Sequence, residues 1–250
     1  MLDFGRSGRK ETVEVLEGAG ITYAGAGRSL EQASRPVRIP VTDETSVVVY
    51  AFGTESSGIP RDWAAGPSRS GVHLLPDLSL ATVNTLVERI HSNRKDGDIT
   101  IASIHWGSNW GHEVPPAHVD FAHALLHGGV DLLHGHSSHH VRPVEVHDGK
   151  LILYGTGDLI TDYEGIGGHE SYRPDLRLLY LVTLDPVGPA LLRMRPLRIR
   201  RMRLERPGRS DTQGLRARLA DISHRFGTRV EIGQRLRCDL QHVARPLLEA

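Results

Sequence analysis

The sequence is poor in cysteine and in long apolar runs, and each shortage excludes a class of protein. Its 250 residues contain one cysteine, Cys238, which excludes an internal disulfide and any cysteine-rich zinc or iron–sulfur site. No apolar run approaches the ~20 residues that span a bilayer, and the first residues lack the apolar core of a signal peptide. As written, the sequence predicts a cytoplasmic protein, unless a targeting segment lies upstream of it.

Net charge is also absent, because 30 basic residues balance 30 acidic ones. This balance argues against a nucleic-acid partner. The charge is unevenly distributed, however: residues 189–250 contain 15 arginines and six acids, so they carry +9 and residues 1–188 carry −9. We interpret the arginine-rich strands as a solvated face of a sheet. The alternative is a surface that binds an anionic polymer or a phosphate group.

Hydrophobic periodicity predicts an α/β fold. Helices are expected at residues 9–17, 30–34, 80–93, 116–126 and 211–224, and strands at residues 21–24, 37–41, 46–52, 98–105, 130–133, 176–184 and 190–205. Residues 144–154 and 229–239 predict hairpins, and residues 54–77 a long loop. Because strand, helix and strand follow one another in residues 98–133, we expect a βαβ unit with parallel strands. We expect residues 1–188 to form one domain and residues 189–250 a β-rich extension packed on it.

Histidine is what the sequence has in excess: nine of its 15 histidines lie between His105 and His140. His105, His136 and His139 follow predicted strands, and Asp158 follows the next apolar one. Because the carboxyl ends of parallel strands meet at one edge of a sheet, we predict that the three imidazoles face a common point. Gly135 is expected to allow a sharp turn before His136. Neutral imidazoles suit zinc, iron or manganese, usually with a carboxylate to complete the site.

Each of these residues also has a structural interpretation. A histidine at a strand end is usually a hydrogen-bonded turn residue. Trp106 and Trp110 either pack in the core or form the wall of a substrate pocket. Three acids, Asp158, Asp162 and Glu164, are either ligands or turn residues. The remaining histidines of the run are interpreted as structural or exposed: His134 on the opposite face, His140 in solvent or behind a ligand, and His112, His118, His123 and His127 at the surface or in an interface.

Two long runs, SIHWGSNWGHEVP and GVDLLHGHSSHHVRPVEVHDGKLILYGTGDLITDYEG, resemble the CapA family of poly-γ-glutamate capsule synthesis proteins. The resemblance implies a calcineurin-like metallophosphoesterase fold, an α/β sandwich with a mixed sheet. It implies that His105, His136 and His139 bind divalent metal. The complete fold would hold two ions, and the metal would be Mn, Fe or Zn. It further implies a hydrolase of capsule or cell-envelope polymer synthesis. Its partners would be an anionic polymer or a phosphate-containing small molecule, and other capsule-synthesis proteins; Trp106, Trp110 and Asp158 would contact the substrate.

The sequence departs from the motifs that the resemblance implies. The fold's early Gly-Asp motif, its bridging Asp and its Asn-Asn-His motif are absent, and the sequence starts with Met1-Leu2-Asp3-Phe4-Gly5, the segment expected just after Asn-Asn-His. We therefore expect that Asn-Asn-His is encoded in frame directly upstream, and that Asp3 orients that catalytic His. As written, the chain should bind metal weakly and hydrolyse little, because three neutral imidazoles do not balance two dications. The alternative function is a non-catalytic assembly protein that holds an anionic polymer.

Overall fold

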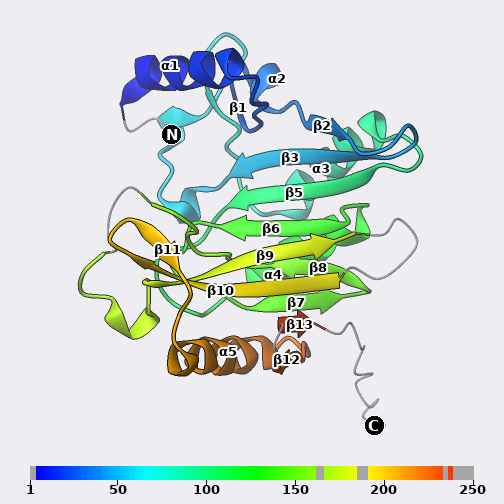
Figure 1. Ribbon diagram of the computed structural model, residues 1–250. Coiled ribbons are helices and arrows are strands. Elements are labelled where there is room, and N and C mark those ends of the chain that lie inside the picture. The colour runs from blue at the N-terminus through cyan, green and yellow to red at the C-terminus, as the bar shows by residue number, and fades with distance from the viewer. Residues whose placement is uncertain (1–3, 162–165, 185–190, 233–235, 239–250) are drawn as a thin grey trace. The chain divides into compact units, whose positions relative to one another are not determined.

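A computed structural model describes residues 4–161, 166–184, 191–232 and 236–238. The chain divides into two compact units: Met1–Ser108 with Pro115–Ser137, and Asn109–Val114 with Ser138–Ala250 (Figure 1). The domain boundary expected at residue 188 stays a prediction. Among the described helices, none is long and apolar enough to cross a membrane.

The first unit alternates helices and strands along the chain. Its helices are α1 (Gly5–Gly18), α2 (Leu30–Ala33), α3 (Leu80–Asn93) and α4 (Pro116–His127), with 3₁₀ turns at Glu55–Ser57 and Arg61–Trp63. Its strands are β1 (Ala26–Gly27), β2 (Val37–Pro40), β3 (Ser46–Gly53), β4 (Gly71–Val72), β5 (Ile99–His105) and β6 (Leu132–His136). The strand expected at residues 21–24 is wrong. Gly20 and Gly25, at φ of +68° and +86°, turn the backbone on either side of that segment, and only β1 beyond it finds a partner, β4.

The sheet of the first unit runs in the order β2-β3-β5-β6. Strand β2 pairs with β3 antiparallel, and β3, β5 and β6 run parallel, so the sheet is mixed as expected. The parallel pairs follow from the crossover helices α3 and α4, which pack on each other behind the sheet (Figure 1). Alternate side chains of β3, namely Val48, Tyr50 and Phe52, are buried beneath this layer. The βαβ unit predicted from residues 98–133 is therefore β5–α4–β6.

The second unit is mostly antiparallel. It contains the hairpin β7 (Val144–His147) and β8 (Lys150–Leu153), the helix α5 (Arg209–His224), a 3₁₀ turn at Glu170–Tyr172, and the strands β9 (Leu176–Thr183), β10 (Leu191–Arg200), β11 (Arg203–Glu205), β12 (Val230–Ile232) and β13 (Leu236–Cys238). The predicted Asp148–Gly149 turn is present, with φ of 49° and 76° at the two residues. The hairpin predicted at residues 229–239 is the antiparallel pair β12–β13.

Helix α5 and the turn after it close one edge of the β7–β8 hairpin. The Val144 N–H donates to Ser223 Oγ, and the Val146 N–H donates to Thr228 Oγ1, both at 3.0 Å. These two amides lie on the same edge of β7, where an unpaired row of N–H groups would invite association with another strand. The hydroxyls of Ser223 and Thr228 therefore act as the missing strand partner.

Candidate metal centre

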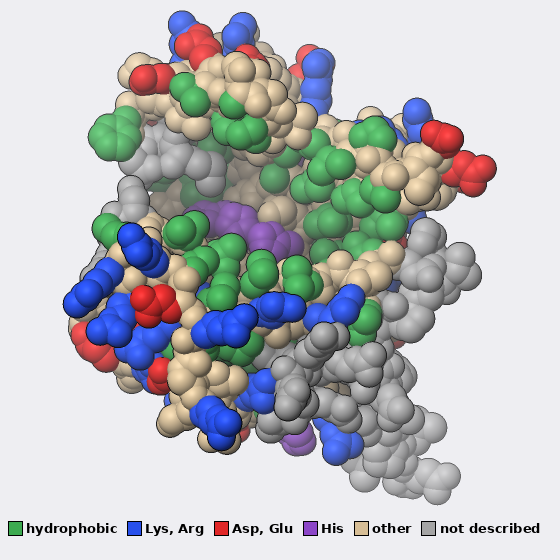
Figure 2. Space-filling model, in the orientation of Figure 1, with side chains coloured by type: hydrophobic (Ala, Val, Ile, Leu, Met, Phe, Trp, Pro, Cys, Tyr) green, Lys and Arg blue, Asp and Glu red, His purple; other side chains and the backbone are tan. Residues whose placement is uncertain are grey.

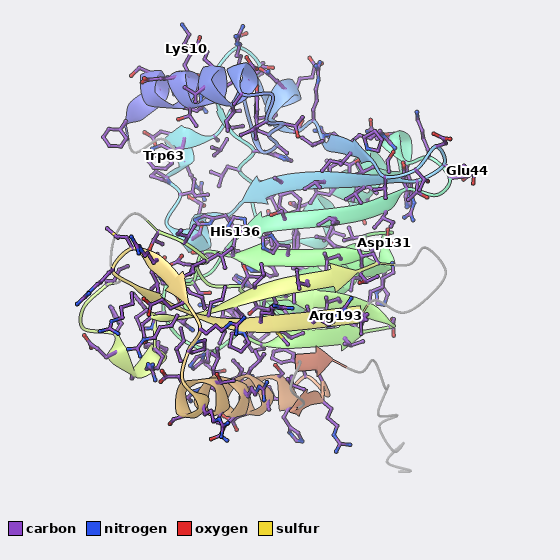
Figure 3. All side chains as sticks on the ribbon, viewed as in Figure 1. Lys10, Glu44, Trp63, Asp131, His136 and Arg193 are labelled. Atoms are coloured by element: carbon purple, nitrogen blue, oxygen red, sulfur yellow. The ribbon has the colours of Figure 1, made fainter. Side chains whose placement is uncertain are left out.

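His105 and His136 are the last residues of the parallel strands β5 and β6, and they are direct neighbours in the sheet. The register pairs the Cα atoms of His105 and His136, and the Trp106 N–H donates to the His136 carbonyl at 3.0 Å. Their side chains converge, with the two Nδ1 atoms 3.1 Å apart (Figure 3 labels His136 at the end of β6). The sheet thus positions two imidazoles at one edge, as expected for this pair from the sequence.

The separation of the two Nδ1 atoms suits a shared metal ion. Two nitrogen ligands at about 2.1 Å from one ion, with an angle between the right angle and the tetrahedral angle, lie about 3.0–3.4 Å apart. The observed 3.1 Å between His105 and His136 falls within this range. The donor set of this pair therefore fits a divalent ion that accepts imidazole nitrogen.

Burial keeps His136 in the neutral form that metal binding requires. It lowers the pKa of His136 to about 3, and the nearby imidazoles of His134 and His105 lower it further. His134 was expected on the opposite face, which is wrong. Two residues apart on a strand, His134 and His136 share a face, and their rings lie 5.4 Å apart. Ser103 Oγ lies 3.0 Å from His134 Nδ1 and holds that ring in place.

A small hydroxyl and indole cluster supports the loop that follows β5. The Gly107 N–H donates to Ser56 Oγ at 3.0 Å, and Ser56 Oγ lies 3.5 Å from His118 Nε2. Trp106 is buried and stacks on His118, with ring centroids 4.5 Å apart. His118 was expected at the surface or in an interface, and this is wrong: its side chain is buried and stacks on Trp106. Trp106 follows His105 in the chain, and its contact with substrate stays a prediction.

The chain reverses at Ser137, not at Gly135. Gly135 continues strand β6 and pairs with Ile104, so the turn expected there is wrong. Ser137 has φ of +136°, a conformation that costs a residue with a side chain about 1–3 kcal/mol. Its Oγ donates to the Gly107 carbonyl at 3.0 Å, which ties the strained residue to the loop after β5. The strain therefore lies directly after His136.

In the second unit, His139 is held by a carboxylate. Its Nδ1 lies 2.9 Å from Asp158 Oδ2, and Arg177 Nη2 lies 3.5 Å from the same oxygen. The Arg177 side chain is 1% exposed, and its Nη1 donates to the His139 carbonyl at 3.2 Å. A carboxylate on Nδ1 leaves Nε2 as the coordinating atom, as in many metal-bound histidines. The arrangement suits a ligand, and the expected convergence of His139 with His105 and His136 stays a prediction.

Arg177 was missed by the sequence reasoning, although the signal was present. It interrupts the apolar strand Leu176–Thr183 at a position flanked by leucines. An arginine between buried leucines is rare unless it has a partner. Such an isolated charge points to a buried ion pair, and here the carboxylate is Asp158.

Trp110 belongs to a ring cluster of the second unit. It stacks on His169 with centroids 4.0 Å apart, and on His140 at 5.8 Å. Tyr172 stacks on His140 at 4.7 Å. His140 is 1% exposed and its pKa is lowered by burial to about 4, so its interpretation as a solvent residue is wrong. Trp110 is half-buried, and its role in contacting substrate stays a prediction.

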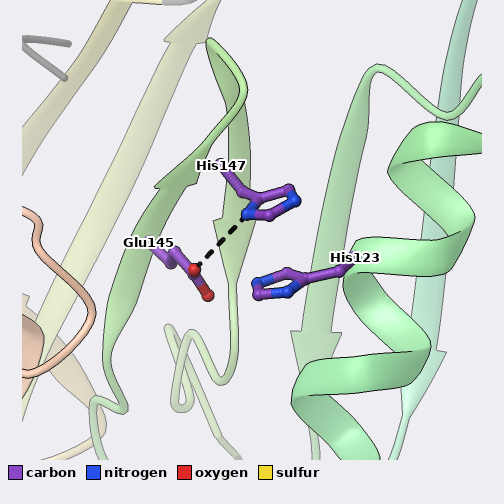
Figure 4. Close-up of side chains that lie close together, drawn as sticks. All are labelled: His123, Glu145 and His147. Atoms are coloured by element: carbon purple, nitrogen blue, oxygen red, sulfur yellow. Dashed lines mark ion pairs between the residues drawn. The ribbon is translucent and has the colours of Figure 1, made fainter. Parts of the chain in front are cut away.

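The β7–β8 hairpin carries a second group of possible ligand atoms. Glu145 is buried and accepts a 2.6 Å hydrogen bond from the Tyr154 hydroxyl. His147 Nδ1 lies 3.9 Å from Glu145 Oε1, and its Nε2 lies 3.5 Å from Asp148 Oδ2. Figure 4 shows the Glu145–His147 pair; His123, drawn in the same view, belongs to α4 of the first unit. Sequence reasoning did not select Glu145 or His147.

Comparison with known proteins identifies the family. Residues 1–163 match the family of bacterial capsule synthesis proteins named PGA_cap. The chain belongs to this family. Membership in PGA_cap confirms the expected metallophosphoesterase-like fold and the predicted resemblance to CapA proteins. It also supports a divalent metal, without showing which one.

Three relatives bear on the function of PGA_cap proteins. A probable polyglutamine synthesis accessory protein of Mycobacterium tuberculosis is 49% identical over 233 residues, which cover 92% of this chain and 61% of the relative. The PGA biosynthesis protein CapA of Bacillus subtilis is 27% identical over 161 residues, covering 64% of this chain and 40% of the relative. The capsule biosynthesis protein CapA of Bacillus anthracis is 23% identical over 162 residues, covering 65% and 38%. The chain thus spans about three fifths of the mycobacterial relative.

Three of the sequence-predicted acids lie outside the described residues: Asp3, expected to act in catalysis, and Asp162 and Glu164, considered as ligands.

Proposed function

We propose that this chain is the metal-binding, phosphoesterase-like part of a protein that acts in the synthesis of an anionic capsule or cell-envelope polymer such as poly-γ-glutamate. The observation that carries the proposal is the convergence of two neutral imidazoles at the carboxyl ends of β5 and β6, with Nδ1 atoms 3.1 Å apart. Family membership and the names of the relatives support the polymer.

In this proposal His105 and His136 hold a divalent ion, and His139 offers a third imidazole whose orientation Asp158 fixes. A divalent ion bound there would polarise a phosphoryl or carbonyl oxygen and lower the pKa of a bound water. The chain's own residues keep a ligand imidazole neutral and hold the neighbouring loops in place. Burial keeps His136 unprotonated, and the Ser137 and Trp106 hydrogen bonds fix the two loops that follow β5 and β6.

The first test is metal content. The purified chain is dialysed against Mn²⁺, Fe²⁺ or Zn²⁺, and the bound ion is measured by elemental analysis for wild type, His105→Gln and His136→Gln. The matched control is His91→Gln, which changes an exposed histidine of α3. We expect both site variants to lose most of the bound metal and the control to retain it. Equal metal content in site and control variants would remove the basis of the proposal.

The second test is hydrolysis of bis(p-nitrophenyl) phosphate by the metal-loaded chain. We expect slow hydrolysis that depends on His136 and not on His91. We also expect fewer than two tightly bound ions per chain, since three imidazoles do not balance two dications. Two tightly bound ions would contradict this ligand set and show that further carboxylates take part.

A further inference from the structure

One cleft of the second unit is lined by arginines that form no ion pair with any described residue. It has a volume of about 570 Å³ and lies between β9, β10, the segment after β11 and α5. Its lining consists of four arginines, one threonine and five apolar residues. These are Arg193, Arg195, Arg206, Arg216, Thr212, Leu181, Met194, Pro196, Leu197 and Pro207. Figure 2 shows basic side chains gathered over the β10–β11 part of this unit, and Figure 3 labels Arg193 on β10. No acidic side chain is among these lining residues.

Neighbouring arginines form ion pairs that hold the fold together, whereas the arginines of the cleft do not within the described residues. On the same strand, Arg198 forms ion pairs with Asp175 at 3.1 Å and Asp211 at 3.3 Å, and Arg173 shares both carboxylates. Arg193 and Arg195 form no ion pair within the described residues. Among the described residues, acids thus accompany Arg198, and none lines the cleft. Four cations gathered in a hollow repel one another until an anion enters.

Arg216 is a further sign of an anion site, because part of its guanidinium is already desolvated. It lies on α5, and its Nε is buried without a hydrogen-bond partner among the described residues. A buried donor without an acceptor is unfavourable, and an incoming oxygen anion removes the penalty.

We propose that this arginine cleft binds a polycarboxylate chain of the γ-linked polyglutamate type. The choice of this polymer rests on the proposed function, and the cleft is the site where the polymer would bind. Two features of the cleft favour a polycarboxylate over a nucleic acid. Its lining contains no aromatic ring on which a base could stack. The second feature is apolar: the side chains of Leu181 and Leu197 can contact the methylene groups of the polymer, while the guanidinium groups bind its carboxylates in a bidentate manner, as they would a phosphate.

The spacing of the arginines also suits this polymer. Arg193 and Arg195 lie two residues apart on β10, so they leave the same face of the strand about 6.6 Å apart. A γ-glutamyl unit contributes five backbone bonds of about 1.3–1.5 Å, so an extended chain carries one carboxylate on the order of every 6 Å. The repeat of the polymer is therefore of the same order as the spacing of the two arginines.

The test measures binding of a fluorescently labelled γ-glutamate oligomer by anisotropy. The cleft variant is Arg193→Gln/Arg195→Gln. The matched control is Arg203→Gln/Arg209→Gln, which removes the same charge from two exposed arginines outside the cleft lining. We expect the cleft variant to bind at least tenfold more weakly than wild type and the control to stay within about threefold. Binding should weaken as salt rises, because charge carries it. Circular dichroism and thermal melts of both variants establish that they are folded.

Three results would overturn the proposal. Equal losses in cleft and control variants would mean that only diffuse charge attracts the oligomer. No measurable binding by the folded wild type would exclude the site. Tighter binding of polyphosphate or single-stranded RNA than of the oligomer would assign the cleft to phosphate chemistry. The His136→Gln variant separates this proposal from the proposed function: it should lose metal and keep oligomer binding. If the wild type binds no metal but binds the oligomer through the cleft arginines, the proposed function fails and the cleft proposal is supported.

Discussion

Replacing Asp158 tests whether this carboxylate positions His139 or contacts substrate. Its Oδ2 lies 2.9 Å from His139 Nδ1 and 3.5 Å from Arg177 Nη2. Breaking a fully buried ion pair typically destabilises a protein by about 3–5 kcal/mol. Arg177 is buried, but Asp158 is 20% exposed, and Arg177 keeps its hydrogen bond to the His139 carbonyl. We therefore expect Asp158→Ala to lower the free energy of unfolding by roughly half of that range, about 2 kcal/mol.

Metal affinity should respond to the same change. Loss of a carboxylate behind a ligating imidazole typically weakens metal binding by about 10–100-fold. Asp158→Asn keeps an oxygen that accepts the Nδ1–H of His139, so it should recover most of the stability and part of the affinity. Urea unfolding gives the stability, and competition with a chromophoric chelator gives the affinity for Zn²⁺ or Mn²⁺. Asp221→Asn, on the exposed face of α5, is the matched control.

The refuting result is specific. If Asp158→Ala binds metal within about twofold of the Asp221→Asn control, the hydrogen bond does not position a ligand. If in addition KM for a phosphodiester rises while metal affinity is unchanged, Asp158 contacts the substrate, which is the role first predicted from the sequence.

Three further predictions concern stability. Burial lowers the pKa of His73 to about 4, so the folded state resists its protonation, and stability should fall by about 2 kcal/mol between about pH 7 and pH 5, reaching its full loss below pH 4. His73→Gln should reduce this loss in urea titrations at the two pH values; an unchanged loss would contradict it. Ser137→Gly should be about 1 kcal/mol more stable than Ser137→Ala, because both lack the hydroxyl and only alanine resists φ of +136°; equal thermal midpoints would disprove the strain. Ser223→Ala should destabilise by about 1–3 kcal/mol, since the buried Val144 N–H loses its acceptor; a change below about 0.5 kcal/mol in urea unfolding would show that another group replaces it.

Local pattern determined most of the elements. The apolar spacing of residues 80–93 predicted α3 with its observed bounds, and Ser79 caps it by accepting the Thr82 N–H. The βαβ order of β5, α4 and β6 also followed from periodicity, and the parallel pairing of its strands is what brings His105 and His136 together. These predictions succeeded because they depend on contacts between residues close in the chain or on a crossover with one favoured geometry.

Tertiary structure decided the features that depend on partners distant in the sequence. Ile21 and its neighbours have strand-forming side chains, but the two-residue β4 offers pairing only to Ala26 and Gly27. The reversal at Ser137 required a hydrogen bond from its side chain to Gly107, 30 residues earlier. Asp158 is hydrogen-bonded to His139 and paired with Arg177, whose burial depends on the packing around β9. The sequence alone determined which residue types could bind metal or anions. Only the fold decided which arginines found acids and which remained in a cleft, because a charge is satisfied by what lies beside it in space.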